Sequence, residues 1–311
     1  MKTPATLFFS LFFFTASAKT WQVGAGKTYT KPSAVASLVQ NGDTVAIDAG
    51  TYVGDVANWT KNNLVLKGVG GLAHLNANNT AYGRKGIWLI TGTNTTVENI
   101  EFSHCHDVDG LDLNWAGIRM QGTDLTVKNC YFHDNDNGIL GGGSTSNSNV
   151  VISYTEFNHN GYGDGYSHNL YISNIDSLIF THNYSHHATI GHELKSRAYV
   201  NYILYNRIMN ESTGDASREI DLPNGGTAIV MGNLIEQGAN TSNSNLIGYG
   251  LEGLSNPAAL EVYLINNTIV NDRSAGSFVQ LASGTAKFKA YNNIFAGPGS
   301  LLSGTATVID T

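Results

Sequence analysis

The segment Met231-Gly232-Asn233-Leu234-Ile235 places an asparagine before a short apolar step, and the same arrangement returns along the chain. The other copies are Thr181-His182-Asn183-Tyr184, Leu204-Tyr205-Asn206-Arg207-Ile208, Ile265-Asn266-Asn267-Thr268-Ile269 and Tyr291-Asn292-Asn293-Ile294-Phe295. Extending the register towards the N-terminus adds Ile100, Cys130 and Thr155. The steps between successive positions are then 30, 25, 28, 23, 27, 34 and 26 residues. The chain is therefore a coiled repeat with a period mostly in the twenties.

The composition of each repeat favours strands over helices. Between the anchors the residues are β-branched or aromatic and are interrupted by Gly, Asn and Asp, with no helical periodicity. These features indicate a parallel β-solenoid, in which each winding lays its strands on those of the previous winding. A column of asparagines can hydrogen-bond along the stack and to free backbone groups. The alternative is that asparagine only marks surface turns.

The N-terminus has the pattern of a secretory signal peptide. Lys2 precedes the apolar run 7–14, and the small residues Ala16-Ser17-Ala18 follow it. The run is too short to span a membrane. We therefore expect residues 1–18 to be removed, leaving a secreted (extracellular or periplasmic) protein with one domain over residues 19–311.

The charge balance argues against two classes of partner. The formal net charge is -7 and the basic residues form no dense cluster along the sequence, whereas nucleic acids and anionic membranes both attract dense positive charge. We expect no nucleic acid partner, no membrane partner and a monomer. The balance does not argue against neutral or acidic glycans.

Residues 19–71 are expected to form an N-terminal cap and the first turns. The stretch 32–39 has apolar residues at helical spacing, so a short helix there would cover the open end of the first winding. This opening, the repeat period and the asparagine column together resemble the secreted right-handed parallel β-helix proteins of the pectate-lyase-like superfamily. The resemblance implies an all-β, right-handed parallel β-helix with a short N-terminal capping helix. It implies no single reaction, because the superfamily includes lyases, hydrolases, epimerases and non-enzymatic proteins.

A second column of residues predicts the position of a functional site. Pairs such as Leu170-Tyr171, Leu194-Lys195 and Ile220-Asp221 recur in each winding, and the aliphatic member should face the core. The flanking residues should then point outward, and adjacent strands lie about 4.8 Å apart, so three windings would form one exposed patch. Its expected members are Asn169, Tyr171, Glu193, Lys195, Arg197, Glu219 and Asp221, flanked by His168, His192 and Arg218.

This concentration of charge is a functional signal in a chain that is only 13% charged. Elimination from a uronate-containing polysaccharide needs a cation on the sugar carboxylate, a base for the adjacent proton and an acid for the leaving oxygen. We assign Arg197 and Arg119 to carboxylate binding. The candidates for base and acid are Lys195, His192, His168 and Tyr171. The further candidates for substrate binding are Asn169, Arg218 and two possible stacking platforms in the preceding loop, Tyr162 and Tyr166.

Several alternatives to a polysaccharide lyase stay open. Glu193, Glu219 and Asp221 satisfy on paper the paired carboxyl groups of a glycoside hydrolase. A uronate epimerase shares the proton-abstraction step, and a non-catalytic solenoid could bind glycans through the same patch. The charges could also form a ladder of salt bridges, Lys195 with Asp221 and Arg197 with Glu219. The two histidines of the patch could instead point inward at a corner.

Two oxygen-rich segments leave calcium open as a cofactor. They are 107–112, with three aspartates, and 134–138, with two. Neither has the terminal glutamate and flanking helices of an EF-hand, so turns rich in Asp and Asn explain them better. The sequence predicts no defined metal ligands.

Overall fold

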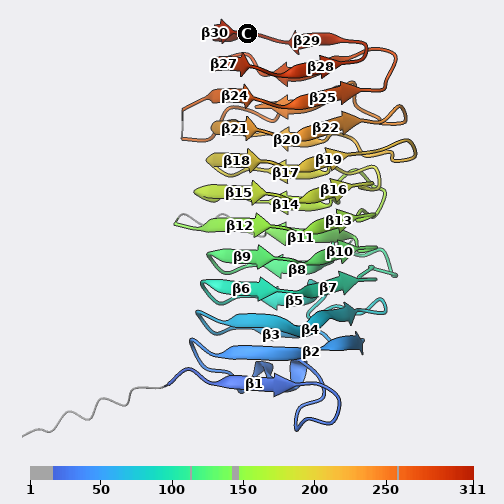
Figure 1. Ribbon diagram of the computed structural model, residues 1–311, viewed down its shortest axis with the longest axis vertical. Helices are drawn as coiled ribbons and strands as arrows, with labels where there is room; N and C mark the ends of the chain where they lie inside the picture. The colour runs from blue at the N-terminus through green and yellow to red at the C-terminus, as the bar shows by residue number, and fades with distance from the viewer. Residues whose placement is uncertain (1–16, 113, 142–146, 258) are drawn as a thin grey trace, which may run out of the picture.

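The computed structural model describes residues 17–112, 114–141, 147–257 and 259–311, so positions 1–16 of the expected signal peptide lie outside the described residues. The described chain is a stack of β-windings with one short helix (Figure 1). All strand pairs in the two sheets are parallel and join successive windings. The prediction of an all-β parallel solenoid is confirmed. Within the described residues, no helix is long and apolar enough to cross a membrane.

Each regular winding contributes one strand to a ten-stranded sheet and two strands, the first and second arms, to a twenty-stranded sheet. The ten-stranded sheet contains β3 (Ala57–Trp59), β5 (Gly86–Ile90), β8 (Ala116–Met120), β11 (Asn137–Gly141), β14 (Leu170–Ile172), β17 (Leu194–Ser196), β20 (Ile220–Leu222), β23 (Asn245–Tyr249), β26 (Ser277–Leu281) and β29 (Ser300–Ser303). The first arm contains β1 (Thr20–Val23), β6 (Thr95–Glu98), β9 (Leu125–Lys128), β12 (Asn149–Ser153), β15 (Ser177–Thr181), β18 (Val200–Leu204), β21 (Thr227–Met231), β24 (Glu261–Ile265), β27 (Thr285–Tyr291) and β30 (Ala306–Asp310). The second arm contains β7 (Ile100–Ser103), β10 (Tyr131–His133), β13 (Glu156–Asn158), β16 (Tyr184–His186), β19 (Arg207–Met209), β22 (Leu234–Gln237), β25 (Thr268–Asn271) and β28 (Ile294–Ala296). The long strands β2 (Thr44–Val53) and β4 (Val65–Asn76) run through both arms.

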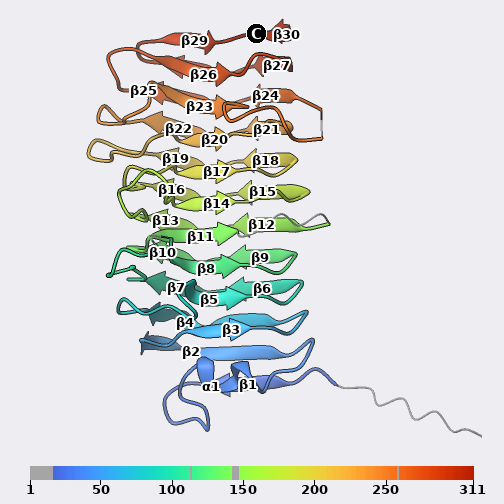
Figure 2. The same ribbon diagram turned by 180° about the vertical axis from the view of Figure 1, so that it is seen from behind.

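The solenoid is right-handed. In Figure 1 the chain runs from left to right through β6 and β7 on the near side, and the strands of the ten-stranded sheet return from right to left behind them. Figure 2 shows these returning strands from the other side. Because the chain rises towards its C-terminus as it turns, the winding has the right-handed sense expected of parallel crossovers.

Every second residue of a strand faces the interior of the solenoid and fills it. Strands β15, β21 and β24 alternate between half-buried and fully buried residues, as a strand with one face on a core requires. Like residues stack between windings. The rings of Phe102, Phe132 and Phe157 are stacked with centroids 4.8 and 5.1 Å apart. Such a core holds the windings in one register, because a shift by one residue would expose the whole apolar face.

The predicted asparagine column is present at the corner between the two arms. The side-chain amide of Asn206 donates to Asn233 Oδ1 at 2.9 Å and to the carbonyl of Phe180 at 2.9 Å. Asn183, Asn233 and Asn267 repeat this pair of bonds with their own neighbours. The column therefore supplies hydrogen-bond donors to backbone carbonyls in the strands of the first arm.

Replacing one member of this column should be costly. In Asn206→Ala the carbonyl of Phe180, the amide oxygen of Asn233 and the backbone and side-chain N–H groups of Asn183 lose a partner. Since a buried unsatisfied group costs about 1–3 kcal/mol, we expect a loss of at least about 3 kcal/mol in the free energy of unfolding, measured by chemical denaturation. Asn240→Ala, in an exposed turn, should change stability little. Equal stabilities of the two variants would contradict this role of the column.

The predicted helix over residues 32–39 is shorter in the structure. Helix α1 spans Ser33–Ala36, a single turn, with Val35 fully buried. It packs against β3. The backbone N–H groups of Leu38 and Val39 both donate to the carbonyl of Val35, so the last helical hydrogen bond of this segment ends at Val39. The short helix lies at the N-terminal end of the stack (Figure 2).

Candidate active site

One column of outward-facing residues crosses the ten-stranded sheet. In β14, β17 and β20 the residues Tyr171, Lys195 and Asp221 are direct partners in the parallel register. The aliphatic residue before each of them, Leu170, Leu194 and Ile220, is fully buried. The structure thus brings the three windings together as the sequence predicted, but Asp221, which was expected in an exposed patch, is only 2% exposed. We call Arg119, Tyr171, Lys195, Arg197, Arg218, Asp221 and Glu252 the basic patch.

The centre of the basic patch is a chain of ion pairs. Lys195 Nζ lies 2.8 Å from Glu252 Oε1 and 3.5 Å from Asp221 Oδ2. Arg218 Nη1 lies 3.3 Å from Asp221 Oδ1. Burial raises the pKa of the Asp221 carboxyl, and the charges of Lys195 and Arg218 oppose that shift. Lys195 therefore lies between two carboxylates.

Arg197 connects this ion-pair chain to the tyrosine. Its Nε donates to Tyr171 Oη at 2.7 Å and its Nη2 to Glu252 Oε2 at 2.6 Å. Burial alone would lower the pKa of the Arg197 guanidinium, but these hydrogen bonds raise it overall. A guanidinium that donates to a phenol oxygen stabilises negative charge on that oxygen. Arg197 thus joins the Tyr171 hydroxyl to Glu252 through two hydrogen bonds.

Among the described residues, Arg119 is the cation of the patch without a matching carboxylate. It is in β8, and Leu140 separates it from Tyr171 in the same column. Its Nε and Nη1 are buried and have no hydrogen-bond partner among the described residues. Burial lowers the pKa of this guanidinium, which interacts electrostatically with Tyr171. Buried charges are normally paired, so this one points to an anionic ligand.

His168 and His192 lie beneath the patch. They are 2% and 6% exposed, and their rings stack with centroids 4.8 Å apart. His192 Nε2 is 3.5 Å from Asp221 Oδ2, and the His168 ring meets the Tyr171 ring edge-on at 5.6 Å. Burial and then neighbouring cations lower both pKa values well below 6.5. Both are therefore neutral, and they support the patch from below rather than face solvent.

Three residues expected on the outside are inside the solenoid. Asn169, Glu193 and Glu219 are fully buried, so the prediction of their outward orientation is wrong. The physical reason is that β14, β17 and β20 begin one residue later. Each of the three occupies the corner before its strand, where the alternation of a strand does not apply. In these corners two successive residues, such as Glu193 and Leu194, both face the core.

The two buried glutamates differ in how many of their carboxyl oxygens accept a hydrogen bond from the described residues. Glu193 accepts bonds from Asn169 Nδ2 at 2.5 Å and from the Ala188 N–H at 2.8 Å. Its burial raises its pKa to about 8 in spite of these bonds. Glu219 Oε1 accepts from Asn210 Nδ2 at 2.8 Å, whereas its Oε2 has no partner among the described residues. Burial raises the pKa of Glu219 well above 4.5, which favours the uncharged form of this side chain.

Sequence reasoning missed Glu252. It is in the turn between β23 and β24 and bridges Lys195 and Arg197. The sequence paired Arg197 with Glu219, but the observed partner is Glu252; the Lys195–Asp221 pair is confirmed. A signal was available, because the step of 34 residues from Asn233 to Asn267 is the longest in the repeat. The extra residues of that winding form the turn that carries Glu252 over the patch.

The two loop tyrosines are not part of the basic patch. Tyr162 and Tyr166 lie in the connection between β13 and β14 and are 42% and 84% exposed. Asp164 Oδ1 accepts hydrogen bonds from the backbone N–H groups of Tyr166 and Ser167, at 2.8 and 3.1 Å, and so shapes the loop. Both rings are available to solvent, and nothing in the described part of the chain ties them to Tyr171.

The aspartates of the first oxygen-rich segment, residues 107–112, pair with an arginine. Arg84 donates to Asp109 Oδ1 at 2.6 Å and to Asp112 Oδ2 at 2.5 Å, and it lies 3.2 Å from Asp107 Oδ1. The pKa of the Asp112 carboxyl is lowered mainly by its hydrogen bond to Arg84. The Arg84 guanidinium thus supplies to these aspartates the positive charge that a bound calcium ion would otherwise supply. In the second segment, Asp136 accepts from the Asp107 N–H at 2.9 Å, as turn aspartates do.

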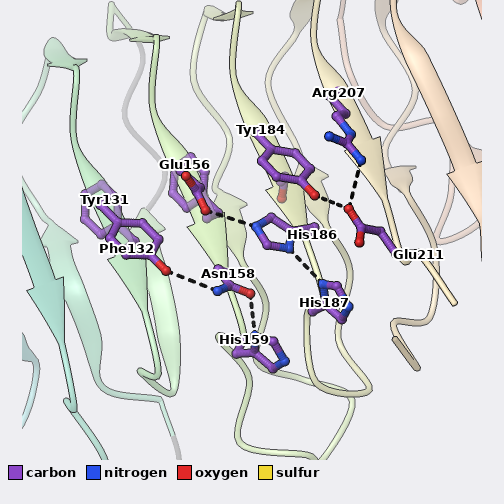
Figure 3. Close-up of polar contacts among 12 residues, drawn as sticks. Tyr131, Phe132, Glu156, Asn158, His159, Tyr184, His186, His187, Arg207 and Glu211 are labelled. Atoms are coloured by element: carbon purple, nitrogen blue, oxygen red, sulfur yellow. Dashed lines mark hydrogen bonds and ion pairs between the residues drawn. The ribbon is translucent and has the colours of Figure 1, made fainter. Parts of the chain in front are cut away.

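A second polar surface lies on the outer face of β13, β16 and β19 (Figure 3). His186 Nε2 is 3.2 Å from Glu156 Oε1, and Arg207 Nη2 is 2.9 Å from Glu211 Oε1. The Tyr184 hydroxyl also donates to Glu211. A groove beside this surface is lined by Tyr154, Thr155, Glu156, His182, Asn183, Tyr184, Tyr205 and Arg207. Since it belongs to the twenty-stranded sheet, it is separate from the basic patch.

No protein-family profile and no curated protein matches this chain. Among solved structures, it is similar to an alginate lyase from Paenibacillus sp. str. FPU-7, with 12% identity, a TM-score of 0.52 and coverage of 93% of this chain and 99% of that one. The Azotobacter vinelandii mannuronan C-5 epimerase AlgE6 A-module gives 14% identity, a TM-score of 0.48 and coverage of 87% and 90%. Pectin methylesterase PemA from Erwinia chrysanthemi gives 12% identity and a TM-score of 0.46, with coverage of 73% of this chain and 81% of that one. By its fold, the chain is a right-handed parallel β-helix protein.

Proposed function

We propose that this protein is a carbohydrate-active enzyme that acts on a uronate-containing polysaccharide, and that it cleaves the chain by β-elimination. The observation that carries the proposal is the excess of positive charge in the basic patch. Among the described residues the patch holds four cations, Arg119, Lys195, Arg197 and Arg218, but two carboxylates. The whole chain is acidic, with a net charge of -7. A local excess of this kind attracts an anionic polymer.

The chemistry follows from the positions of the side chains. Arg119, which lacks a carboxylate partner, would neutralise the sugar carboxylate and so acidify the adjacent C5–H. Tyr171 would act as the phenolate, with Arg197 Nε donating to its oxygen, and would take that proton to become the neutral phenol. The C4–O bond then breaks as the C4=C5 double bond forms, and protonated Lys195 would give a proton to the leaving oxygen. Each proton and electron pair is accounted for by the two side chains and the substrate.

The alternatives can be ranked by burial. Glu193 and Glu219 are fully buried, so they are not accessible as the two carboxyl groups of a hydrolase. Epimerisation is the second candidate, because it uses the same C5 proton abstraction and the same neutralised carboxylate. It differs in returning a proton to the opposite face without chain cleavage. The fold is shared with an alginate lyase, but that likeness concerns the fold alone.

A panel of polymers tests the proposal. Purified protein would be incubated with polymannuronate, polyguluronate, polygalacturonate, polyglucuronate and a neutral glucan in deuterated buffer. We expect ultraviolet absorbance from unsaturated ends to rise together with reducing ends on at least one acidic polymer. Deuterium at C5 without new ends would indicate epimerisation. New ends without absorbance would indicate hydrolysis, and no change in any acidic polymer would refute an enzymatic role.

Arg119→Gln tests whether Arg119 binds the sugar carboxylate or only packs against its neighbours in the sheet. Removing the charge that faces the sugar carboxylate should lower kcat/KM on the acidic polymer by about 10²–10³, as for the loss of one oxyanion donor. Arg207→Gln removes an arginine from the other sheet and should leave kcat/KM unchanged. Steady-state kinetics of the two variants, with circular dichroism to verify folding, makes the comparison. Equal activities would remove Arg119 from the site.

A further inference from the structure

A cluster of two histidines and one carboxylate lies on the outer face of the second arm, away from the basic patch. His74, Glu101 and His133 come from β4, β7 and β10, which pair as neighbours in three consecutive windings. One nitrogen or oxygen atom from each side chain lies within 4.8 Å of the other two. The side chains are 22%, 22% and 14% exposed, so they are sheltered but reachable by a small ion.

The distances in the cluster fit a tetrahedral ion. Glu101 Oε1 lies 3.4 Å from His74 Nε2 and 3.1 Å from His133 Nε2. Zinc bonds of about 2.0–2.2 Å to nitrogen and oxygen place neighbouring ligand atoms about 3.3–3.5 Å apart in a tetrahedron. Two of the three ligand separations are therefore already close to the required value, and a small movement of the His74 or His133 side chain would complete the third.

The surroundings of His133 resemble those of a metal-binding imidazole. Its Nδ1 lies 2.7 Å from Asp134 Oδ2, and a carboxylate on the far nitrogen orients such a ring and makes it more basic. If Nδ1 donates to Asp134, then Nε2 and Glu101 Oε1 are two acceptors 3.1 Å apart. A proton or a metal ion must lie between them. His74 Nε2 contacts Ser103 Oγ at 2.7 Å. If His74 Nε2 binds a metal ion in place of this contact, Ser103 Oγ still has its contact with His104 Nδ1.

We propose that His74, Glu101 and His133 form a transition-metal site that prefers Zn²⁺. Two imidazoles and one carboxylate suit zinc, whereas calcium and magnesium prefer oxygen ligands throughout. Three protein ligands leave the fourth tetrahedral position for water or an anionic ligand. The site does not depend on the polysaccharide chemistry of the basic patch, and each can fail without the other.

Metal titration tests the site directly. The full chain, prepared without a histidine tag and stripped with a chelator, would be titrated with Zn²⁺ by calorimetry and with Co²⁺ by visible absorption. We expect one Zn²⁺ per chain and a tetrahedral Co²⁺ spectrum. Glu101→Gln, which keeps the size of the side chain, and His133→Ala should each weaken binding at least 100-fold. Asp134→Asn should weaken it about 10–100-fold.

The control removes a histidine from a different cluster. His187 Nδ1 lies 2.7 Å from His186 Nδ1 on the second polar surface, and His187→Ala should bind Zn²⁺ as the wild type does. Circular dichroism would show whether each variant is folded, and Glu101→Gln remains informative if His133→Ala is not. The proposal is overturned if the wild type binds no Zn²⁺ at micromolar concentrations, or if binding is lost in His187→Ala and retained in Glu101→Gln.

Discussion

Lys195→Ala and Tyr171→Phe should each reduce turnover on the acidic polymer by about 10²–10⁴, the usual contribution of a positioned acid or base. Both side chains are direct partners in the column of the ten-stranded sheet, and each is assigned one of the two proton transfers. Steady-state kinetics on the polymer identified by the panel gives the measurement. Gln280→Ala, three windings beyond Lys195 in the same column, should retain activity.

A conservative variant distinguishes proton transfer by Lys195 from ion pairing alone. Lys195→Arg keeps the charge that meets Asp221 and Glu252, but a guanidinium does not give up its proton at physiological pH. If Lys195 is the acid, Lys195→Arg should be as inactive as Lys195→Ala. Recovery of most of the activity would assign Lys195 to ion pairing. Full activity in folded Lys195→Ala and Tyr171→Phe would refute the proposed site.

The stability of the protein should fall as the pH rises from 5 to 9. Burial raises the pKa of Glu193 to about 8, above the ordinary value of 4.5 that applies in the unfolded chain. A raised carboxyl pKa stabilises the fold fully below pH 4.5, and this contribution is lost as the pH rises through the folded value. At about 1.4 kcal/mol per pKa unit, Glu193 accounts for at most about 5 kcal/mol. Denaturant unfolding at pH 5, 7 and 9 measures the trend.

Glu219→Gln should reduce this pH dependence. Glutamine can accept the bond from Asn210 Nδ2 through its carbonyl oxygen, and it never has to become charged inside the solenoid. We expect stability close to the wild type at pH 5 and greater stability than the wild type at pH 9. Glu98→Gln, on the outer side of β6, should follow the wild type throughout. A stability that stays flat or rises between pH 5 and 9 would contradict the neutral state of the buried glutamates.

Much of the fold was predictable from local patterns. A strand alternates its side chains, and a repeat in the twenties places equivalent strands on one another, so Tyr171, Lys195 and Asp221 could be brought together from the sequence alone. The asparagine column could be found in the same way, because identical amides stacked at one corner satisfy one another and the backbone. Both predictions depend on interactions that repeat with a constant step.

The column Tyr171, Lys195 and Asp221 was predictable because these residues lie within strands, whereas the corners before the strands were not. Glu193 and Glu219 were assigned outward because the alternation was extended one residue into a corner. The corner turns the backbone, so the periodicity of the strand says nothing about the side chain there. Glu252 was missed for a related reason, since it lies outside the repeated positions. Its contact with Lys195 crosses 57 residues of sequence.

The sequence by itself thus determined the solenoid, its register and the column at the centre of the basic patch, because each follows from a regular spacing and strand geometry. Tertiary structure alone decided which glutamates are buried, which carboxylate meets Arg197, and that Arg119 has no carboxylate partner among the described residues. It also decided that His74, Glu101 and His133 meet across three windings. Those outcomes depend on how irregular corners turn and how far long side chains reach, and neither is encoded in a periodic pattern.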